Sequence, residues 1–225
     1  MEAKFVPESG RIKVMTPVTG NSAYTPPQVS AITGLPLPAV HKAIENRLIR
    51  PKRVRGQRAV RRLLSRSDLL YLRLEAQGLK LLPLATRRQV ARKIEREPGI
   101  DAMYVSAGRV ILVQCKSARK EVNAALRCFD EASRMAESDP DVMHGTPVYK
   151  GTRIPVQIIA DMLSQGATVA EILEGYPALT HRKVELAPLY IRAFPRKGRP
   201  AIRPWAKRPP RRISRSALRV DEILG

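Results

Sequence analysis

One stretch of the chain imitates the side-chain spacing of a metal-dependent nuclease. Asp101 precedes an expected β-hairpin whose second strand ends in Gln114-Cys115-Lys116, and some nucleases place a metal-binding carboxylate and a lysine side by side in this way. Residues 114 and 116 would face the same way if both lay in one strand. One carboxylate beside a neutral glutamine is a poor magnesium site, so a nuclease using Asp101 and Lys116 is kept only as an alternative, and we expect no enzyme.

The other residue types that carry chemistry are scattered. His41, His144 and His181 have no metal-ligand spacing, and no Ser/His/Asp set or glycine-rich phosphate loop occurs. Cys115 and Cys128 are too few for a disulfide scaffold, and we expect both to be buried free thiols. The sequence therefore predicts neither a metal nor a cofactor.

The charge balance points to a polyanionic partner. The 225 residues contain 41 Lys and Arg against 20 Asp and Glu, which leaves a net charge of +21. Aromatic residues make up only 4% of the chain. Because single-stranded bases are read by stacking on aromatic side chains, duplex DNA or a protein is the better candidate.

Two short helices are expected near the N-terminus, after an arm of residues 1–22. Thr25 can cap the first helix, Gln28 can close a capping box, and Gly34 ends it. A second helix fits residues 37–46, and its apolar residues are spaced to share a core with the first helix. The pair has a helix-turn-helix pattern.

A basic segment follows the helix pair. Residues 47–66 contain nine Lys and Arg and no acid, with Gly56 as a turn, which indicates a basic β-wing before a helix that stops at Gly78. The second helix would read base edges in the major groove while the wing contacts phosphates. In the alternative, the helix pair is purely structural, and these cations would repel one another without compensation. The candidate DNA-binding residues are Pro38, His41, Lys42, Asn46, Lys52, Arg53, Arg55, Arg58 and Arg61.

Two parts of this region, residues 23–78, resemble the winged helix-turn-helix of MerR-type regulators. The matching residues are Leu48-Ile49-Arg50-Pro51-Lys52-Arg53 and Leu63-Leu64-Ser65-Arg66-Ser67-Asp68-Leu69-Leu70-Tyr71-Leu72. The resemblance implies a promoter-binding domain. It does not extend to the effector-sensing half of that family, because no long dimer-forming coiled coil or metal-binding cysteine loop follows.

Residues 79–140 form an expected α/β middle segment. We expect a helix over residues 86–97, a hairpin of strands 102–106 and 109–114, and a long helix over about 117–137. This segment can complete a small core or form a dimer contact, and the sequence leaves both open.

Residues 141–194 carry the most specific pattern in the chain. The segment 145–156 contains Gly-Thr-Arg-Ile-Pro-Val, and residues 176–180 read Tyr-Pro-Ala-Leu-Thr. Thr168 with Glu171 forms a capping box and Thr180 can cap a further helix, so three short helices are expected, the last two spaced as a second helix-turn-helix. Arg153 is expected to pair with a nearby acid in a structural turn.

These two motifs closely resemble a small helix-turn-helix family, long described as of unknown function, that occurs in antitoxins of bacterial toxin–antitoxin pairs. The resemblance implies an antitoxin of the VapB type. The second helix-turn-helix either touches DNA or only joins two chains, and both options stay open.

The segment 195–225 is rich in proline and contains ten basic residues against Asp221 and Glu222, so it cannot pack a core of its own. One interpretation is a solvated basic linker. The resemblance implies instead a tail that occludes a PIN-type ribonuclease toxin, whose acidic site can accept arginines through bidentate contacts. The candidate toxin-binding residues are Arg203, Trp205, Arg208, Arg211, Arg212 and Leu218.

The expected fold is mainly α with small β elements: an N-terminal winged helix-turn-helix, a middle β-hairpin plus helices, a C-terminal three-helix module and an extended basic tail. The resemblances imply an antitoxin that neutralises a ribonuclease toxin and represses its own operon. A transcription regulator without a toxin partner is the alternative. A homodimer is expected because palindromic operators have two-fold symmetry. No apolar stretch approaches the roughly 20 residues that cross a bilayer, so we expect a cytoplasmic protein with no membrane partner.

Overall fold

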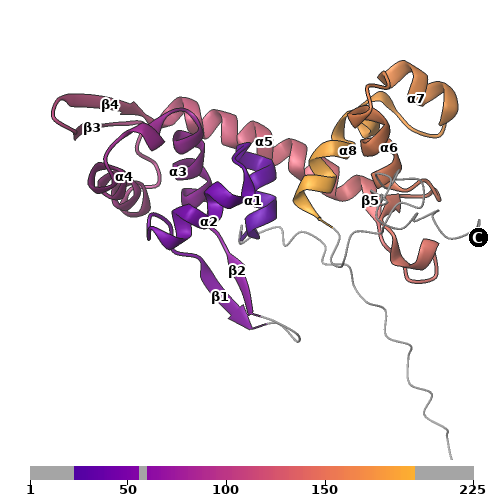
Figure 1. Ribbon diagram of the computed structural model, residues 1–225, viewed down its shortest axis with the longest axis horizontal. Coiled ribbons are helices and arrows are strands. Elements are labelled where there is room, and N and C mark those ends of the chain that lie inside the picture. Colours follow the sequence, from indigo (N-terminus) through magenta and orange to yellow (C-terminus); the bar gives the residue numbers. More distant parts are fainter. Residues whose placement is uncertain (1–22, 56–59, 196–225) are drawn as a thin grey trace, which may run out of the picture. The chain divides into compact units, whose positions relative to one another are not determined.

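The computed structural model describes residues 23–55 and 60–195 (Figure 1). Within them the fold is mainly helical, with three two-stranded antiparallel sheets, which confirms the expected fold class. The N-terminal arm, Arg58 and the tail from residue 196 lie outside the described residues. Among the helices that are described, none is long and apolar enough to cross a membrane.

The first two helices begin and end where the sequence predicts. Helix α1 (Pro26–Thr33) follows Thr25, whose backbone N–H donates to Gln28 Oε1 at 2.8 Å. Gly34 ends the helix with a φ of 79°, a left-handed conformation that glycine adopts without steric cost. Helix α2 (Leu37–Glu45) then packs on α1 through buried Val40 and Ala43.

A two-stranded wing follows α2. Strands β1 (Lys52–Arg55) and β2 (Val60–Leu63) pair antiparallel and lead into helix α3 (Arg66–Ala76). Ser65 caps α3: its backbone N–H donates to Asp68 Oδ2 at 2.7 Å, and its hydroxyl oxygen accepts from Asp68 N–H. An isolated bridge between Tyr24 and Leu64 ties the base of the wing to the start of α1.

The middle of the chain consists of helix α4 (Leu84–Arg96), strands β3 (Ala102–Ser106) and β4 (Val110–Gln114), and the long helix α5 (Cys115–Met135), with the short 3-10 helix η1 (Leu79–Leu81) before α4. The expected hairpin is confirmed. Helix α5 begins earlier than predicted because the Asp101 carbonyl accepts hydrogen bonds from Cys115 N–H and Lys116 N–H at 2.8 and 2.9 Å. Lys116 therefore lies in a helix, and the shared strand face expected for residues 114 and 116 is wrong.

The C-terminal module contains the three predicted helices. A short sheet of β5 (Ala136–Glu137) and β6 (Val148–Tyr149), with the 3-10 helix η2 (Met143–Gly145) between them, precedes α6 (Val156–Ser164), α7 (Val169–Gly175) and α8 (His181–Ala193). Thr168 caps α7 in a capping box with Glu171, and Thr180 caps α8, both as expected.

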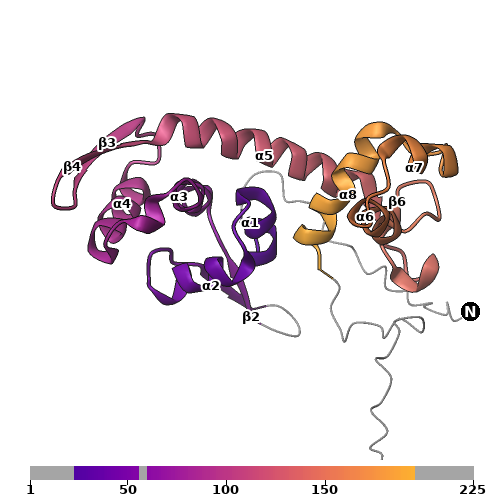
Figure 2. The same cartoon turned by 45° about the horizontal axis from the view of Figure 1, so that its top comes forward.

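Helix α5 links the winged half of the chain to the C-terminal module. It packs on α3 toward its beginning, on α1 near its middle and on α8 farther along, an arrangement visible in Figure 2. Helix α8 packs on α1 in turn. Four aromatic rings join these helices, with centroid distances of 5.9 Å for Tyr24–Phe129, 5.8 Å for Phe129–Phe194 and 4.8 Å for Tyr190–Phe194. The two halves thus share one row of aromatic contacts.

The two cysteines differ in burial. Cys115 is buried at the start of α5, as expected, and burial raises the pKa of its thiol. Cys128 is only half-buried, and Arg182 Nη2 on α8 donates to its sulfur at 3.3 Å. The expectation that both thiols are buried is wrong for Cys128.

Candidate nucleic-acid interface

Helix α2 has one apolar and one polar side, as a recognition helix requires. Val40 and Ala43 are buried against α1, whereas Pro38 and Lys42 are exposed on the other side. His41 and Asn46 are half-buried. All four predicted base-reading residues thus belong to one short helix and its C-cap, of which Pro38 and Lys42 are the most accessible.

The end of α2 holds a cation in a strained backbone conformation. Arg47 N–H donates to the Ile44 carbonyl and Leu48 N–H to the Ala43 carbonyl, both at 3.0 Å, which is a Schellman motif. The left-handed residue of that motif is usually glycine, but here it is Arg47, with a φ of 57°. Its side chain is exposed. The chain therefore keeps an arginine where glycine would fold more easily.

The two faces of the wing carry different side chains. Arg53 lies opposite Arg62 and Arg55 opposite Val60, so one face holds three exposed arginines. Lys52, Val54, Arg61 and Leu63 lie on the other face. No acid forms an ion pair with Arg53, Arg55 or Arg62 within the described chain. Like charges directly opposite each other destabilise a hairpin. A polyanion bound across this face would reduce that repulsion.

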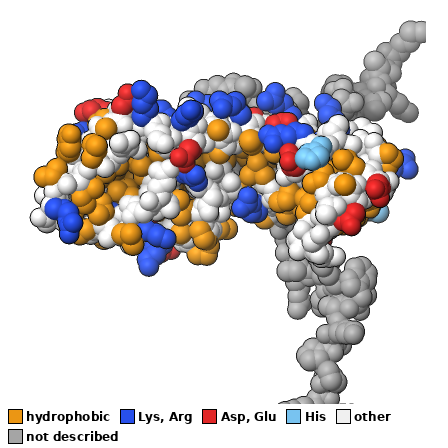
Figure 3. All heavy atoms as spheres, turned by 90° about the horizontal axis from the view of Figure 1, so that it is seen from above, with side chains coloured by type: hydrophobic (Ala, Val, Ile, Leu, Met, Phe, Trp, Pro, Cys, Tyr) orange, Lys and Arg blue, Asp and Glu red, His pale blue; other side chains and the backbone are white. Residues whose placement is uncertain are grey.

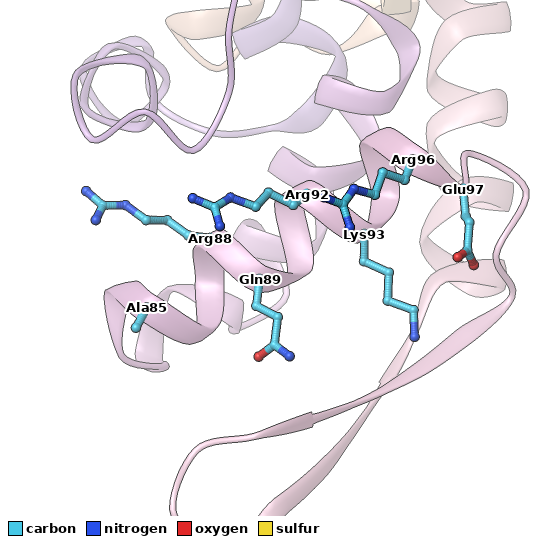
Figure 4. A pocket seen from close by; sticks show the side chains of 7 residues that line it. All are labelled: Ala85, Arg88, Gln89, Arg92, Lys93, Arg96 and Glu97. Carbon is cyan, nitrogen blue, oxygen red and sulfur yellow. The ribbon is translucent and has the colours of Figure 1, made fainter.

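Helix α4 adds a row of arginines that we did not predict as part of the site. Arg88, Arg92 and Arg96 are spaced by four residues and are all exposed. Figure 4 shows them following one another along α4, while Lys93 and Gln89 point in another direction, and all five residues line a cavity of about 550 Å³. The four-residue spacing was visible in the sequence, but only the fold shows that this side of α4 lies near α2 and the wing.

A groove of about 790 Å³ joins these elements. Arg88 Nη2 donates to the Asn46 carbonyl at 3.3 Å, which ties α4 to the end of α2. The groove's acids are Asp68, which is engaged by the Ser65 cap and whose pKa is raised by burial, and Glu95. Its basic lining residues are Arg47, Arg50, Lys52, Arg88, Arg92 and Arg96.

A buried ion pair fixes α4 against α3. Glu75 Oε1 accepts from Arg87 Nε at 2.9 Å and from Arg87 Nη2 at 2.5 Å, and also from the Tyr71 hydroxyl. The Glu75 side chain is only 8% exposed and that of Arg87 16%. Burial lowers the pKa of Arg87, but hydrogen bonds with Glu75 and Tyr71 outweigh it, so that the pKa lies above its ordinary value. Burial also raises the pKa of Tyr71. The Glu75–Arg87 pair therefore helps to hold Arg88, Arg92 and Arg96 on the side of the groove.

The basic residues of the second helix-turn-helix are partly engaged within the chain. Arg182 on α8 binds Glu131 on α5, with Nε and Nη2 at 3.0 and 2.9 Å from Oε2, and its Nη1 lies 3.6 Å from Glu185. This interaction lowers the pKa of Glu131. His181 Nδ1 lies 3.5 Å from Glu185. Helix α8 itself packs on α1, α5 and α6.

The Gly-Thr-Arg-Ile-Pro segment forms a tight turn before α6. Gly151 has a φ of 76°, and the Thr152 hydroxyl donates to the Tyr149 carbonyl at 2.8 Å. Arg153 is exposed and forms no ion pair with any described residue, so the expected pairing with an acid is wrong. Backbone geometry rather than an ion pair holds this motif.

The residues of the nuclease alternative meet through the backbone, because the Asp101 carbonyl accepts from Lys116 N–H at 2.9 Å. Asp101 Oδ1 lies 3.1 Å from Arg119 Nη1, and Lys116 is in the first turn of α5. Within residues 23–55 and 60–195, no cluster of three or more His, Cys, Asp and Glu could hold a metal ion. Of the predicted site residues, Arg58 and the six tail residues lie outside the described ranges.

Comparisons with known proteins concern the C-terminal module. Residues 137–191 match the family model "Protein of unknown function (DUF433)", a segment that includes both C-terminal motifs and all of α6 and α7. The chain is also similar to "Uncharacterized protein y4eO" of Sinorhizobium fredii (strain NBRC 101917 / NGR234), with 41% identity over 68 residues, which is 30% of this chain and 31% of that protein. No solved structure matches. The resemblance of the C-terminal module to a small family of unknown function is thus confirmed.

Proposed function

We propose that the protein binds duplex DNA through α2, the wing and α4, and that it acts as an antitoxin that represses its own operon. The observation that carries DNA binding is the basic surface formed by these three elements, on which Arg53, Arg55 and Arg62 form no ion pair within the described residues. Phosphate contacts from such a surface supply affinity, whereas side chains of the helix in the major groove supply sequence preference.

The order of elements supports a MerR-like winged domain. Two short helices, a two-stranded wing and a Ser-capped helix follow one another over residues 26–76. In this arrangement Pro38 and Lys42 on α2 face bases, and Arg53, Arg55 and Arg62 on the wing face phosphates. The α4 arginines extend the phosphate-binding surface beyond the wing.

The antitoxin role rests on the C-terminal resemblance and on the composition of the tail. The family resembled at residues 145–180 occurs in antitoxins, and the segment after Pro195 combines ten cations with Trp205. An acidic ribonuclease site of the PIN type would accept arginines through paired hydrogen bonds, and a buried tryptophan is a typical anchor of such an interface. The partners are thus a PIN-type toxin, operator DNA and a second copy of the chain.

Binding to the chain's own promoter fragment tests the DNA proposal. We expect the logarithm of affinity to fall steeply with the logarithm of salt concentration, and Arg53→Ala/Arg55→Ala to reduce the slope by roughly 2, about 0.9 for each lost phosphate contact. Arg88→Ala/Arg92→Ala should have a similar effect. Lys120→Ala/Arg127→Ala is the matched control, because it removes two exposed cations of α5 and should leave the slope unchanged.

Sequence preference is a separate measurement, because any basic chain binds DNA. The ratio of affinities for the promoter and for a scrambled duplex should fall about tenfold or more in Lys42→Ala, as expected when one base contact is lost. Equal binding of both duplexes by the unaltered chain would refute operator recognition.

Co-expression with the product of the neighbouring reading frame tests the antitoxin role. A stoichiometric partner retained at high salt, whose RNase activity appears only after this chain is removed, would support it. The absence of such a partner, together with specific promoter binding, would favour the second candidate, a stand-alone transcription regulator. The two proposals therefore fail independently.

A further inference from the structure

The β3–β4 hairpin presents one face that no described residue covers. Its strands pair Tyr104 with Leu112 and Ser106 with Val110, which places these side chains on a single face. Tyr104 is 70% exposed, Val110 72% and Leu112 46%. The opposite face, by contrast, is part of the core, with Met103, Val105 and Val113 buried. The exposed face is called the outer hairpin face below and consists of Ala102, Tyr104, Ser106, Val110, Leu112 and Gln114.

The outer hairpin face is uncharged on a strongly basic chain. None of the ten residues of β3 and β4 is acidic or basic, although the whole chain carries a net charge of +21. In the view of Figure 3, hydrophobic side chains gather over the end of the molecule that holds this hairpin. Soluble proteins usually place charges or prolines on exposed strands, which prevents association with other chains. Contiguous exposed apolar patches mark interaction sites. Strands β3 and β4 contain neither a charged residue nor a proline.

We propose that the outer hairpin face binds the same face of a second copy of the chain and forms a two-fold symmetric dimer. A two-fold contact brings identical patches together, so the patch must be complementary to itself. An uncharged apolar face meets this condition. A basic face does not, and two chains of +21 repel each other wherever cations meet.

Other occupants fit the face less well. A nucleic acid or an acidic protein needs cations, which the outer hairpin face lacks. The chain's own segment 195–225 contains ten basic residues, and the uncharged apolar face offers them no counter-charge. The choice of a second copy rests on the proposed function, because a two-fold operator requires two readers.

The test is the mass of the full chain in solution, measured without DNA by sedimentation equilibrium over a range of protein concentrations. The unaltered chain should have twice the mass of one 25.1 kDa chain. Leu112→Arg should weaken the dimer about 100-fold or more, because it opposes like charges across the axis. Tyr104→Arg is a second, independent variant. Both side chains are exposed, so unchanged thermal melting at low concentration would show that the fold is intact.

Ile158→Arg is the matched control, because Ile158 on α6 is 43% exposed but lies outside the hairpin. The Ile158→Arg variant should dimerise as the unaltered chain does. A monomeric unaltered chain, or a dimer that both hairpin variants leave unchanged, would overturn the proposal. A dimer that binds no promoter would refute DNA recognition but not this interface, whereas promoter binding by a monomer would refute the interface alone.

Discussion

Arg47 strains the backbone at the end of α2 and also contributes a cation to the groove. It occupies the left-handed position that ends α2, and an L-residue there costs about 1 kcal/mol or more. An arginine at this position also lines the groove between the wing and α4. Backbone strain of this kind often accompanies function, which makes the position a direct test of the proposed interface.

We expect Arg47→Gly to weaken promoter binding while the free energy of unfolding stays unchanged or rises by up to about 1 kcal/mol. Glycine relieves the strain, although it adds entropy to the unfolded chain. Chemical denaturation and binding titration on the same preparation measure the two effects. Loss of stability together with loss of binding would show that Arg47 has only a structural role.

Sequence spacing alone does not decide which way a side chain points. The spacing of Asp101, Gln114 and Lys116 is that of a site carried by β-strands. Hydrogen bonds to the Asp101 carbonyl, however, start a helix at Cys115. Short strings of residues specify side-chain types, whereas the direction of each side chain depends on where the helix begins.

Helices α3 and α4 are joined by apolar core residues and by one buried ion pair, Glu75–Arg87. Glu75→Gln would leave the buried guanidinium of Arg87 without its counter-charge, and we expect a loss of about 3 kcal/mol in the free energy of unfolding. Glu121→Gln is the matched control, because the Arg73–Glu121 pair is 33% and 38% exposed and should contribute less than about 1 kcal/mol. Equal losses in the two variants, measured by urea denaturation, would contradict this account.

The contact between α5 and α8 should depend on pH. Arg182 lowers the pKa of Glu131 in the folded chain, so the stabilisation is present above the ordinary glutamate pKa and is lost as the pH falls through the lowered value. The difference in the free energy of unfolding between the unaltered chain and Glu131→Gln should therefore be positive at pH 7 and shrink between about pH 5 and pH 3. A difference that does not vary with pH would exclude this ion pair as its source.

Local signals predicted the elements well because they depend on neighbouring residues. Thr25, Gly34, Thr168 and Thr180 begin or end helices where expected, since caps satisfy backbone groups within one turn. The part of the site that was missed, the arginine row on α4, depends on how α4 packs on α3. That packing involves a shared apolar core and the Glu75–Arg87 pair, and no local pattern specifies these tertiary contacts.

The last ring packed within the described fold is that of Phe194. This ring stacks on Phe129 and contacts Tyr190, while the candidate toxin-binding residues all come after it. A chain ending at Pro195 should therefore keep its thermal melting temperature and promoter binding but lose neutralisation of the toxin. The readouts are melting temperature, promoter affinity and inhibition of the co-expressed ribonuclease, and neutralisation at unchanged affinity would refute a role for the tail.

The aromatic row from Tyr190 through Phe194 and Phe129 to Tyr24 has a consequence for how the protein is destroyed. A protease that unfolds the described fold from its C-terminal side extracts Phe194 early, and this takes α8 away from α1. Helix α1, on which α2 packs, would then lose this support before the protease reached it. Degradation from this end would thus release the promoter at an early step, so that loss of the tail and renewed transcription would occur together.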